Sequence, residues 1–192
     1  MITQDFFNLT NKILIASPYT MEGNVFHQSL IYVVYHNADG AVGFIFNRLL
    51  SNSCAEDVLK KIQPPLNLNT LDLKVNVGGP VEIDRGFFLH STDYDKNTLF
   101  KSEGGSLAVS SSLEILSDIS NGKGPEHKMF IVGYTAWGVN QMEIEFQNNL
   151  WMVLEPDSEL IFNPDNNSKW AKALSKLGVD SADFIPGLYG CA

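Results

Sequence analysis

The feature that most constrains this chain is an unbroken apolar run, residues 30–35, that leads into a tight-turn sequence. The β-branched and aromatic side chains of the run predict a strand over residues 29–36 that is buried on both faces. Asp39-Gly40 follows, and this dipeptide is a strong signal for a two-residue turn. Because the chain then becomes apolar again, the sequence predicts a central β-hairpin over residues 29–47.

The rest of the chain alternates short apolar runs with amphipathic segments, without a strict strand–helix–strand order. Further strands are expected at residues 12–16, 73–77, 86–90, 99–101, 107–109, 128–134 and 151–154. Helices are expected at residues 53–62, 111–121, around 139–150, and 169–177. This order predicts an α/β protein of the mixed, α+β kind: a largely central mixed sheet with helices packed on it. It also predicts a single compact domain over residues 1–192, with a frayed tail from about residue 185.

Two of the expected helices begin with a capping-box pattern. Ser53 is followed three residues later by Glu56, and Ser111 by Glu114. In this arrangement the hydroxyl and the carboxylate satisfy backbone amides that the first helical turn leaves unpaired. Gly122 is well placed to end the second of these helices in a left-handed conformation.

The charge balance of the chain argues against several kinds of partner. It carries 22 acidic and 13 basic residues, a net charge of −9 at pH 7. A surface this negative repels phosphate backbones, so direct contact with nucleic acid or with a membrane surface is not expected. The densest basic group, Lys169, Lys172 and Lys176, falls at helical spacing and is interpreted as a solvated helix face. There is no secretory signal pattern, and Cys54 and Cys191 form no disulfide framework, which together predict a cytoplasmic protein with free thiols.

The sequence lacks the motifs that are typical of nucleotide-binding, metal-binding and serine hydrolase sites. Residues 122–124 are Gly-Lys-Gly, without the leading glycine and the Ser or Thr of a phosphate-binding loop, and no G-x-G-x-x-G is present. Residues 104–106 lack the closing glycine of a nucleophile elbow. The four histidines show no metal-ligand spacing. No cofactor and no metal are therefore expected.

Four segments, in order along the chain, resemble a known family. They are Leu14-Ile15-Ala16-Ser17-Pro18 with Ser29-Leu30-Ile31-Tyr32; His36-Asn37-Ala38-Asp39-Gly40-Ala41-Val42-Gly43; Gly78-Gly79-Pro80-Val81 with Arg85-Gly86-Phe87 and Leu89-His90-Ser91; and Gly133-Tyr134-Thr135-Ala136-Trp137-Gly138 with Gln141, Glu143 and Glu145. On these motifs, which extend from about residue 9 to residue 178, the chain resembles the YqgE/AlgH family.

The resemblance implies a compact bacterial cytosolic α/β fold, and some relatives carry a transcriptional-regulator label. Two positions depart from the family pattern, because Ala136 stands where glycine is common and Val139 where proline is common. No helix-turn-helix pattern is recognisable in this chain, and its charge argues against direct contact with DNA.

The first candidate site residues follow the strand that ends near residue 77. Gly78-Gly79-Pro80 can expose successive backbone amides to an anion, and Arg85 lies five residues further on. The alternative is a tight turn that needs positive φ angles, and turn statistics favour it. His90 ends the next strand and is a candidate general base, or a strand-end histidine bonded to nearby groups.

The second group of candidates is Tyr134, Trp137 and Gly138, in a segment interpreted as a strand-to-helix turn. Trp137 is expected either to stack on a planar ligand or to anchor the core. Turns at strand ends are where open α/β sheets bind their ligands. The sequence therefore predicts that Gly78, Gly79, Arg85, His90, Tyr134, Trp137 and Gly138 line one concavity.

Three functional hypotheses follow. The preferred one is a non-catalytic binding or regulatory domain, a monomer or weak oligomer, that acts through contacts with a protein or a small ligand. The alternative is an enzyme of unrecognised class that uses His90 with Arg85. A transcriptional regulator that contacts DNA directly ranks third.

Overall fold

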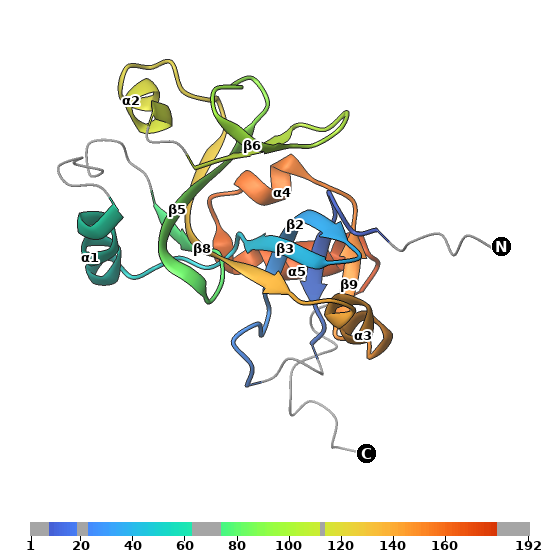
Figure 1. Cartoon of the computed structure of the whole chain (residues 1–192). Helices are drawn as coiled ribbons and strands as arrows, with labels where there is room; N and C mark the ends of the chain where they lie inside the picture. Colours follow the sequence, from blue (N-terminus) through green and yellow to red (C-terminus); the bar gives the residue numbers. More distant parts are fainter. Residues whose placement is uncertain (1–7, 19–22, 63–73, 112–113, 180–192) are drawn as a thin grey trace.

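The computed structural model describes residues 8–18, 23–62, 74–111 and 114–179. Within these ranges nine strands form one sheet, and five helices pack on it (Figure 1). The strands are β1 (Ile13–Ala16), β2 (Leu30–Asn37), β3 (Gly40–Ile45), β4 (Val75–Val77), β5 (Val81–Ser91), β6 (Thr98–Lys101), β7 (Leu107–Ser110), β8 (Lys128–Trp137) and β9 (Trp151–Leu154). The helices are α1 (Asn52–Ile62), α2 (Glu114–Ser120), α3 (Gln141–Gln147), α4 (Ser158–Phe162) and α5 (Asn166–Lys176).

The sheet is almost entirely antiparallel, in the order β6-β7-β5-β8-β3-β2-β1-β9. β4 pairs with β8 and is the one parallel neighbour among the described strands. β8 pairs with strands on both of its sides, because residues 128–132 pair with β5 and residues 135–137 pair with β3. The sheet thus has a hairpin arm (β9, β1, β2, β3) and a β5 arm (β5, β7, β6), joined along β8.

Gly133 lies between the two paired stretches of β8. Its φ of 69° is in the left-handed region, which side chains other than hydrogen rarely tolerate. A Cβ at this position would lie 2.7 Å from the Gly79 carbonyl oxygen and 2.9 Å from that of Val81. Glycine is therefore required where β8 passes from one arm to the other.

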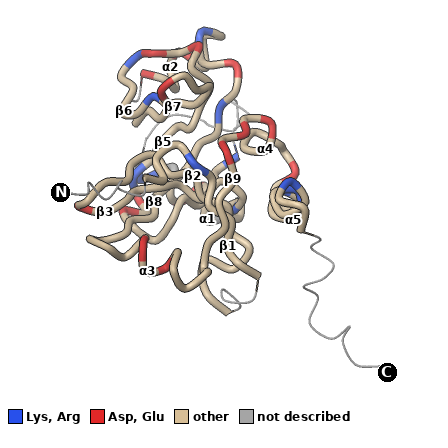
Figure 2. The backbone as a smooth tube through the Cα atoms, turned by 90° about the vertical axis from the view of Figure 1, so that its right-hand side faces the viewer, with Lys and Arg blue, Asp and Glu red and all other residues tan. Residues whose placement is uncertain are grey.

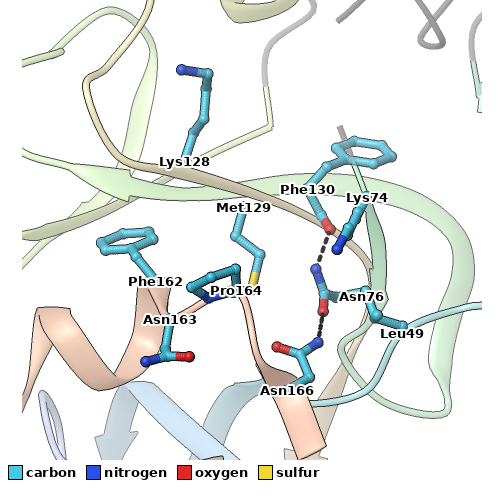
Figure 3. Close-up of a pocket in the computed structure, with 10 residues that line it drawn as sticks. All are labelled: Leu49, Lys74, Asn76, Lys128, Met129, Phe130, Phe162, Asn163, Pro164 and Asn166. Atoms are coloured by element: carbon cyan, nitrogen blue, oxygen red, sulfur yellow. Dashed lines mark hydrogen bonds between the residues drawn. The ribbon is translucent and has the colours of Figure 1, made fainter. Parts of the chain in front are cut away.

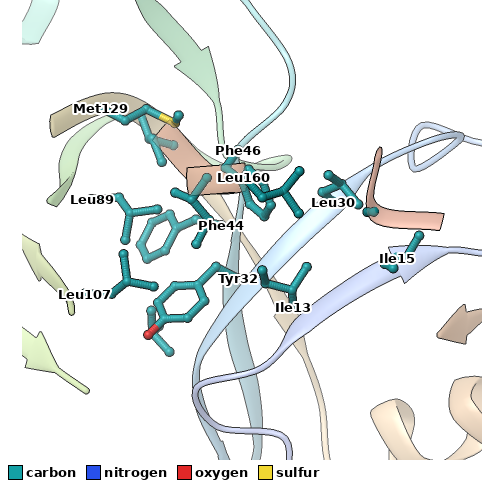
Figure 4. Packing of buried hydrophobic residues seen from close by; sticks show 14 of the residues in the cluster. Ile13, Ile15, Leu30, Tyr32, Phe44, Phe46, Leu89, Leu107, Met129 and Leu160 are labelled. Carbon is teal, nitrogen blue, oxygen red and sulfur yellow. The ribbon is translucent and has the colours of Figure 1, made fainter. Parts of the chain in front are cut away.

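The main core lies between the two arms. Figure 4 shows Leu89 of β5 and Leu107 of β7 facing Tyr32 and Phe44 of the central hairpin. Across the same core the rings of Phe44 and Phe87 lie 5.0 Å apart, centre to centre. α4 and α5 close part of it with buried side chains: Leu160, Ile161, Trp170, Ala173 and Leu174. The sheet therefore curls until its two arms bury each other's inner faces.

Each arm also buries its outer face, under a different set of helices. On the hairpin arm, Met142 of α3 packs in a cluster with Trp137 and Trp151. On the β5 arm, α2 contributes Ile115 and Leu116 to a cluster that α1 also contacts. The strands are consequently apolar on both faces, as the run at residues 30–35 indicates.

Several sequence predictions are confirmed. The central hairpin forms, with Ile31 opposite Ile45 in the register. The Asn37 side chain accepts a hydrogen bond from the Asp39 amide at 2.8 Å, which closes the turn. The segment after Gly138 is a helix, α3. The α+β architecture with one central sheet is also confirmed.

Two local expectations are wrong. Residues 134–137 continue β8 instead of forming a strand-to-helix turn, because β3 offers them a hydrogen-bonding neighbour and pairs with residues 135–137. α4 is not among the expected helices, because five residues are too few to show a helical period. Its start is nevertheless marked in the sequence, since the Asp157 side chain accepts from the Leu160 amide at 2.9 Å.

The interpretation of Lys169 as part of a solvated helix face is also wrong. The Lys169 side chain is completely buried, and its Nζ donates to the carbonyl oxygens of Phe46 at 3.2 Å and Ile161 at 2.7 Å. Lys172 and Lys176 are exposed, as expected. The local spacing is correct, but the α4–α5 corner covers the first lysine and satisfies it with backbone oxygens.

Some predictions concern residues that lie outside the ranges that the structure describes. The Ser53 side chain, residues 112–113 and the tail from residue 180 are among them, so the capping boxes and the frayed terminus stay predictions. Gly122 ends α2 with a φ of 69°, as predicted. None of the described helices is both long and apolar enough to cross a membrane.

Candidate functional site

His90 lies on the outer face of β5, against the ring of Tyr94. Its ring is fully buried, with Nδ1 2.8 Å from the Ser91 carbonyl oxygen and Nε2 2.9 Å from Ser110 Oγ. Because a carbonyl only accepts, Nδ1 carries the proton and Nε2 accepts from the hydroxyl. Burial lowers the pKa of His90. Both ring nitrogens are thus satisfied inside the fold, which favours the strand-end interpretation over the general base.

Trp137 is a core anchor and not a ligand wall. Its side chain is buried on the outer face of the hairpin arm, and its Nε1 donates to Glu145 Oε2 at 2.9 Å. Trp151 Nε1 donates to the same oxygen at 2.7 Å. The Gly138 amide donates to the Gln141 side chain at 3.1 Å, in the turn that starts α3. These contacts hold α3 against the sheet and leave no ligand surface at the indole.

The glycine pair serves close packing against β8. The Gly78 amide donates to the Val132 carbonyl at 2.8 Å, and the Gly78 carbonyl accepts from the Ile45 amide at 2.9 Å. Any side chain at Gly79 would collide with the backbone of Tyr134. The structural interpretation of this motif is therefore supported by its contacts, whereas an anion at Gly78 would have to displace a sheet hydrogen bond.

Arg85 and Tyr134 are the two candidates that come together, on the inner face of the sheet. Between Val81 and Gly86 the register of β5 with β8 shifts, and this bulge carries Glu82 and Arg85. Arg85 Nη1 donates to Glu82 Oε2 at 2.9 Å, and the Tyr134 hydroxyl donates to Glu82 Oε1 at 3.1 Å. Bulges re-aim side chains in this way at the edges of sites.

These three polar groups influence one another. Hydrogen bonds from Arg85 and then from Tyr134 hold the pKa of Glu82 below its ordinary value. Desolvation and the bond to Glu82 raise the pKa of Tyr134. The carboxylate is therefore charged and the phenol protonated across the neutral pH range. Glu82 also adopts a left-handed φ of 46°, which is uncommon for a residue with a side chain and marks the bulge as constrained.

Arg85 and Tyr134 border a cavity that we call the inner groove. It has a volume of about 310 Å³ and lies between the two arms, on the part of the inner face that α4 and α5 leave open. Five aromatic side chains line it: Tyr35, Phe44, Phe87, Phe100 and Tyr134. Four aliphatic side chains complete it: Val34, Val42, Leu99 and Val109. The Arg85 guanidinium lies 5.1 Å from the centre of the Phe87 ring.

The predicted single concavity is therefore wrong for the whole set. Arg85 contacts Phe87 on the inner face of β5, whereas His90 contacts Tyr94 on the outer face. Trp137 belongs to a third location, the outer face of the hairpin arm. An open parallel sheet would gather its strand ends at one edge, but this curled antiparallel sheet distributes them.

Sequence reasoning misses most of the groove. Tyr35, Glu82 and Phe100 are not among its candidates. Phe100 lies in a strand of only four residues, which is too short for the sequence to show which of its side chains face the groove. Tyr35 lies in the apolar run that predicts a strand buried on both faces, and its 48% exposure is seen only in the structure. Among the described residues no three His, Cys, Asp or Glu side chains are grouped to hold a metal ion.

Comparison with known proteins places this chain among bacterial relatives. A family model described as AlgH-like matches residues 13–182. A UPF0301 protein of Rickettsia africae is 45% identical over 183 residues, covering 93% of this chain and 94% of the relative. A UPF0301 protein of Rickettsia prowazekii is 43% identical over 184 residues, covering 96% of each chain.

Two solved structures are similar. The solution structure of the AlgH protein from Pseudomonas aeruginosa matches with a TM-score of 0.75 and 32% identity, over 100% of both chains. Protein DIP2367 from Corynebacterium diphtheriae matches with a TM-score of 0.66 over 88% of this chain and 87% of that one. Its identity is 15%, so that likeness shows the fold alone. The family model and the identities together show that this chain belongs to the AlgH-like family.

Proposed function

We propose that this protein is a binding domain that takes a small, flat, apolar molecule with one acidic group in the inner groove. The observation that supports this most is the convergence of five aromatic rings from five strands on one open cavity. Small-ligand sites are typically apolar clefts with a few placed polar groups. The volume of about 310 Å³ corresponds to roughly ten water molecules, enough for a single-ring compound with a short chain.

Arg85 provides the preference for an acidic group. Its side chain is half exposed and pairs with the similarly exposed Glu82. An exposed ion pair of this kind contributes only about 0–1 kcal/mol, so a ligand carboxylate can compete for the guanidinium. Glu82 would then keep its hydrogen bond from Tyr134. The polar groups of the groove are a guanidinium and two phenols, which orient a ligand, and this supports binding over turnover.

The enzyme hypothesis draws no support from the geometry of the described residues. It requires His90 and Arg85 to act on one substrate, yet the two side chains lie on opposite faces of β5. We therefore retain the binding function.

The test uses 4-phenylbutyrate as the probe and backbone amide NMR shifts as the readout. Shifts should concentrate on β3, β6 and β8 around the groove. Arg85→Gln should weaken binding of 4-phenylbutyrate by about tenfold, since a hydrogen bond to a charged group contributes about 1.5 kcal/mol, and should leave the neutral 4-phenylbutanol unchanged.

A matched pair of variants locates the site. Leu99→Trp should block binding, because Leu99 lines the groove and is 59% exposed. Val139→Trp should not, because Val139 is 63% exposed and lies outside the groove. Shifts centred elsewhere, or equal binding by both tryptophan variants, would contradict the proposal.

We also infer that the protein works in the cytoplasm, as a monomer or weak oligomer, without contacting DNA or membranes. Cys54 is an exposed free thiol, which suits a reducing compartment. In Figure 2 the Lys and Arg residues are scattered among Asp and Glu and form no stripe in that view. A gel shift at physiological salt should therefore show no retained DNA at micromolar protein. Sequence-specific retention would favour the regulator hypothesis.

A further inference from the structure

A second cavity, independent of the inner groove, lies where β4 and β8 meet the loop between α4 and α5. Its volume is also about 310 Å³. Figure 3 shows three asparagines on its walls, Asn76, Asn163 and Asn166, together with Lys74 and Lys128. We call it the asparagine pocket. None of the residues that line it is acidic, although acids outnumber bases in this chain by 22 to 13.

Asn76 is a buried residue of the pocket, and hydrogen bonds hold both ends of its side-chain amide. It is 97% buried within β4, where an amide side chain is costly unless it is hydrogen-bonded. Its Nδ2 donates to the Phe130 carbonyl at 3.4 Å, and its Oδ1 accepts from Asn166 Nδ2 at 3.0 Å. This chain of bonds fixes which end of each amide is the donor. The Asn166 Oδ1 is therefore held away from Asn76 as an acceptor, and Figure 3 shows it turned toward the pocket.

Asn163 offers the complementary group. Its Oδ1 accepts from the Asp165 amide at 2.9 Å, so its Nδ2 is the end left to donate to a ligand. The pocket thus presents an amide acceptor at Asn166 and an amide donor at Asn163. An amide acceptor and an amide donor on the walls of one pocket match hydroxyl groups, which both donate and accept.

The two lysines give the pocket a positive rim. No described acid lies within ion-pair distance of either ammonium, and Lys128 Nζ bonds only the Pro125 carbonyl, at 3.1 Å. Glu126, two residues before Lys128, is not part of the lining. Asp165, between Pro164 and Asn166, is not part of the lining either, and its carboxylate accepts from the Ser168 amide at the start of α5. Lysine is a common point-charge partner for phosphate.

We propose that the asparagine pocket binds a small hydroxylated phosphate ester of the sugar-phosphate class. The phosphate lies at the lysine rim, and the hydroxyl groups lie against Asn163 and Asn166. Met129 and Phe162 form the apolar side of the pocket, on which the carbon skeleton of the ligand rests (Figure 3).

Ribose 5-phosphate is the probe, with binding measured by calorimetry and located by amide NMR shifts. It should bind and shift the amides of residues 74–76, 128–130 and 163–166. Ribose, which lacks the phosphate, and inorganic phosphate, which lacks the hydroxyls, should each bind at least tenfold more weakly. Adenosine 5′-monophosphate carries the same ribose phosphate and should compete for the pocket.

Two variants test the site without changing the fold. Lys74→Gln removes an exposed charge of the rim and should weaken ribose 5-phosphate at least fivefold, whereas Lys172→Gln removes an exposed charge elsewhere on the surface and should not. Asn163→Asp keeps the acceptor for the Asp165 amide but replaces the donor with a negative oxygen, so it should abolish binding.

Three results would overturn the proposal: no binding of ribose 5-phosphate at 10 mM, equal losses in the two lysine variants, or full affinity in Asn163→Asp. Inorganic phosphate binding as tightly as the ester would also overturn it, because the amides would then have no part. None of these results bears on the inner groove, whose probe and variants are different.

Discussion

Trp137 of β8 and Trp151 of β9 donate their indole N–H groups to one oxygen, Oε2 of Glu145, at 2.9 Å and 2.7 Å. The two rings meet edge to face, 6.1 Å apart. Glu145 Oε1 also accepts from Gln141 Nε2 at 2.9 Å. A single half-buried carboxylate thus joins α3 to strands from opposite sides of the hairpin arm.

Removing that carboxylate should destabilise the protein well beyond the loss of a surface charge. Glu145→Ala leaves two indole donors without their acceptor, and we expect a loss of about 3 kcal/mol in the free energy of unfolding. Glu145→Gln keeps one acceptor and should lose about 1 kcal/mol. Urea denaturation followed by tryptophan fluorescence measures both. Glu103→Ala, at an exposed loop position, is the control, and an equal loss there would contradict the role of Glu145.

Lys169 should make stability depend on pH above neutrality. Burial lowers the pKa of Lys169 to about 8, against about 10.5 in the unfolded chain. Between these values the unfolded chain binds more protons than the folded one, so the free energy of unfolding rises with pH. From pH 7.5 to 9.5 the rise should be about 1–2 kcal/mol.

Denaturation at the two pH values tests this. Lys169→Met should abolish the rise, whereas Lys172→Met, at an exposed position on the same helix, should retain it. The window ends at pH 9.5 because tyrosines of the unfolded chain ionise near pH 10. A flat profile in the unsubstituted protein would show that the buried ammonium is not destabilised.

Gly133 and Gly104 form a matched pair for testing the bend in β8. Both have positive φ angles, 69° and 62°, but a Cβ at Gly104 would meet nothing within 4 Å. Gly104→Ala should therefore lose about 1 kcal/mol, the conformational cost alone. Gly133→Ala adds a clash with two carbonyl oxygens and should lose about 3 kcal/mol or more. Equal thermal shifts for the two variants would mean that the close approach at Gly133 relaxes freely.

The thiols provide a chemical check on compartment. Titration of unreduced, denatured protein should find both Cys54 and Cys191 free, because neither belongs to a disulfide framework in the sequence. A single reactive thiol per chain, or none, would contradict the proposed cytoplasmic location.

The elements that sequence patterns predict correctly are those decided by neighbouring residues. The hairpin depends on residues 30–35 and the Asp39-Gly40 turn, and α3 depends on a helical period of a few turns. The length of β8 is decided by a distant partner, β3, and the burial of Lys169 by α4 and the loop after β3. Local patterns carry no information about either.

The residues of the candidate site also fall into two groups: those that local sequence patterns indicate, and those that only the fold brings together. Arg85 and Tyr134 are found because glycines next to strands mark special backbone. Their partner Glu82 has no such mark, and the groove walls become neighbours only when the sheet curls. The asparagine pocket unites residues 74–76 with residues 162–166, and no pattern in either segment indicates the other.

The pairing of β1 with β9 also means that β1 must wait during translation for one of its partner strands. Residues 13–16 lie against residues 151–154 along their whole length. At about 5–20 residues per second, the ribosome delivers the second strand roughly 7–30 seconds after the first. Until then β1 can pair with β2 of the hairpin, but the other edge of β1, which faces β9 in the finished fold, is unpaired. During translation this apolar edge is available to other chains, so the nascent protein should depend on chaperones for that interval.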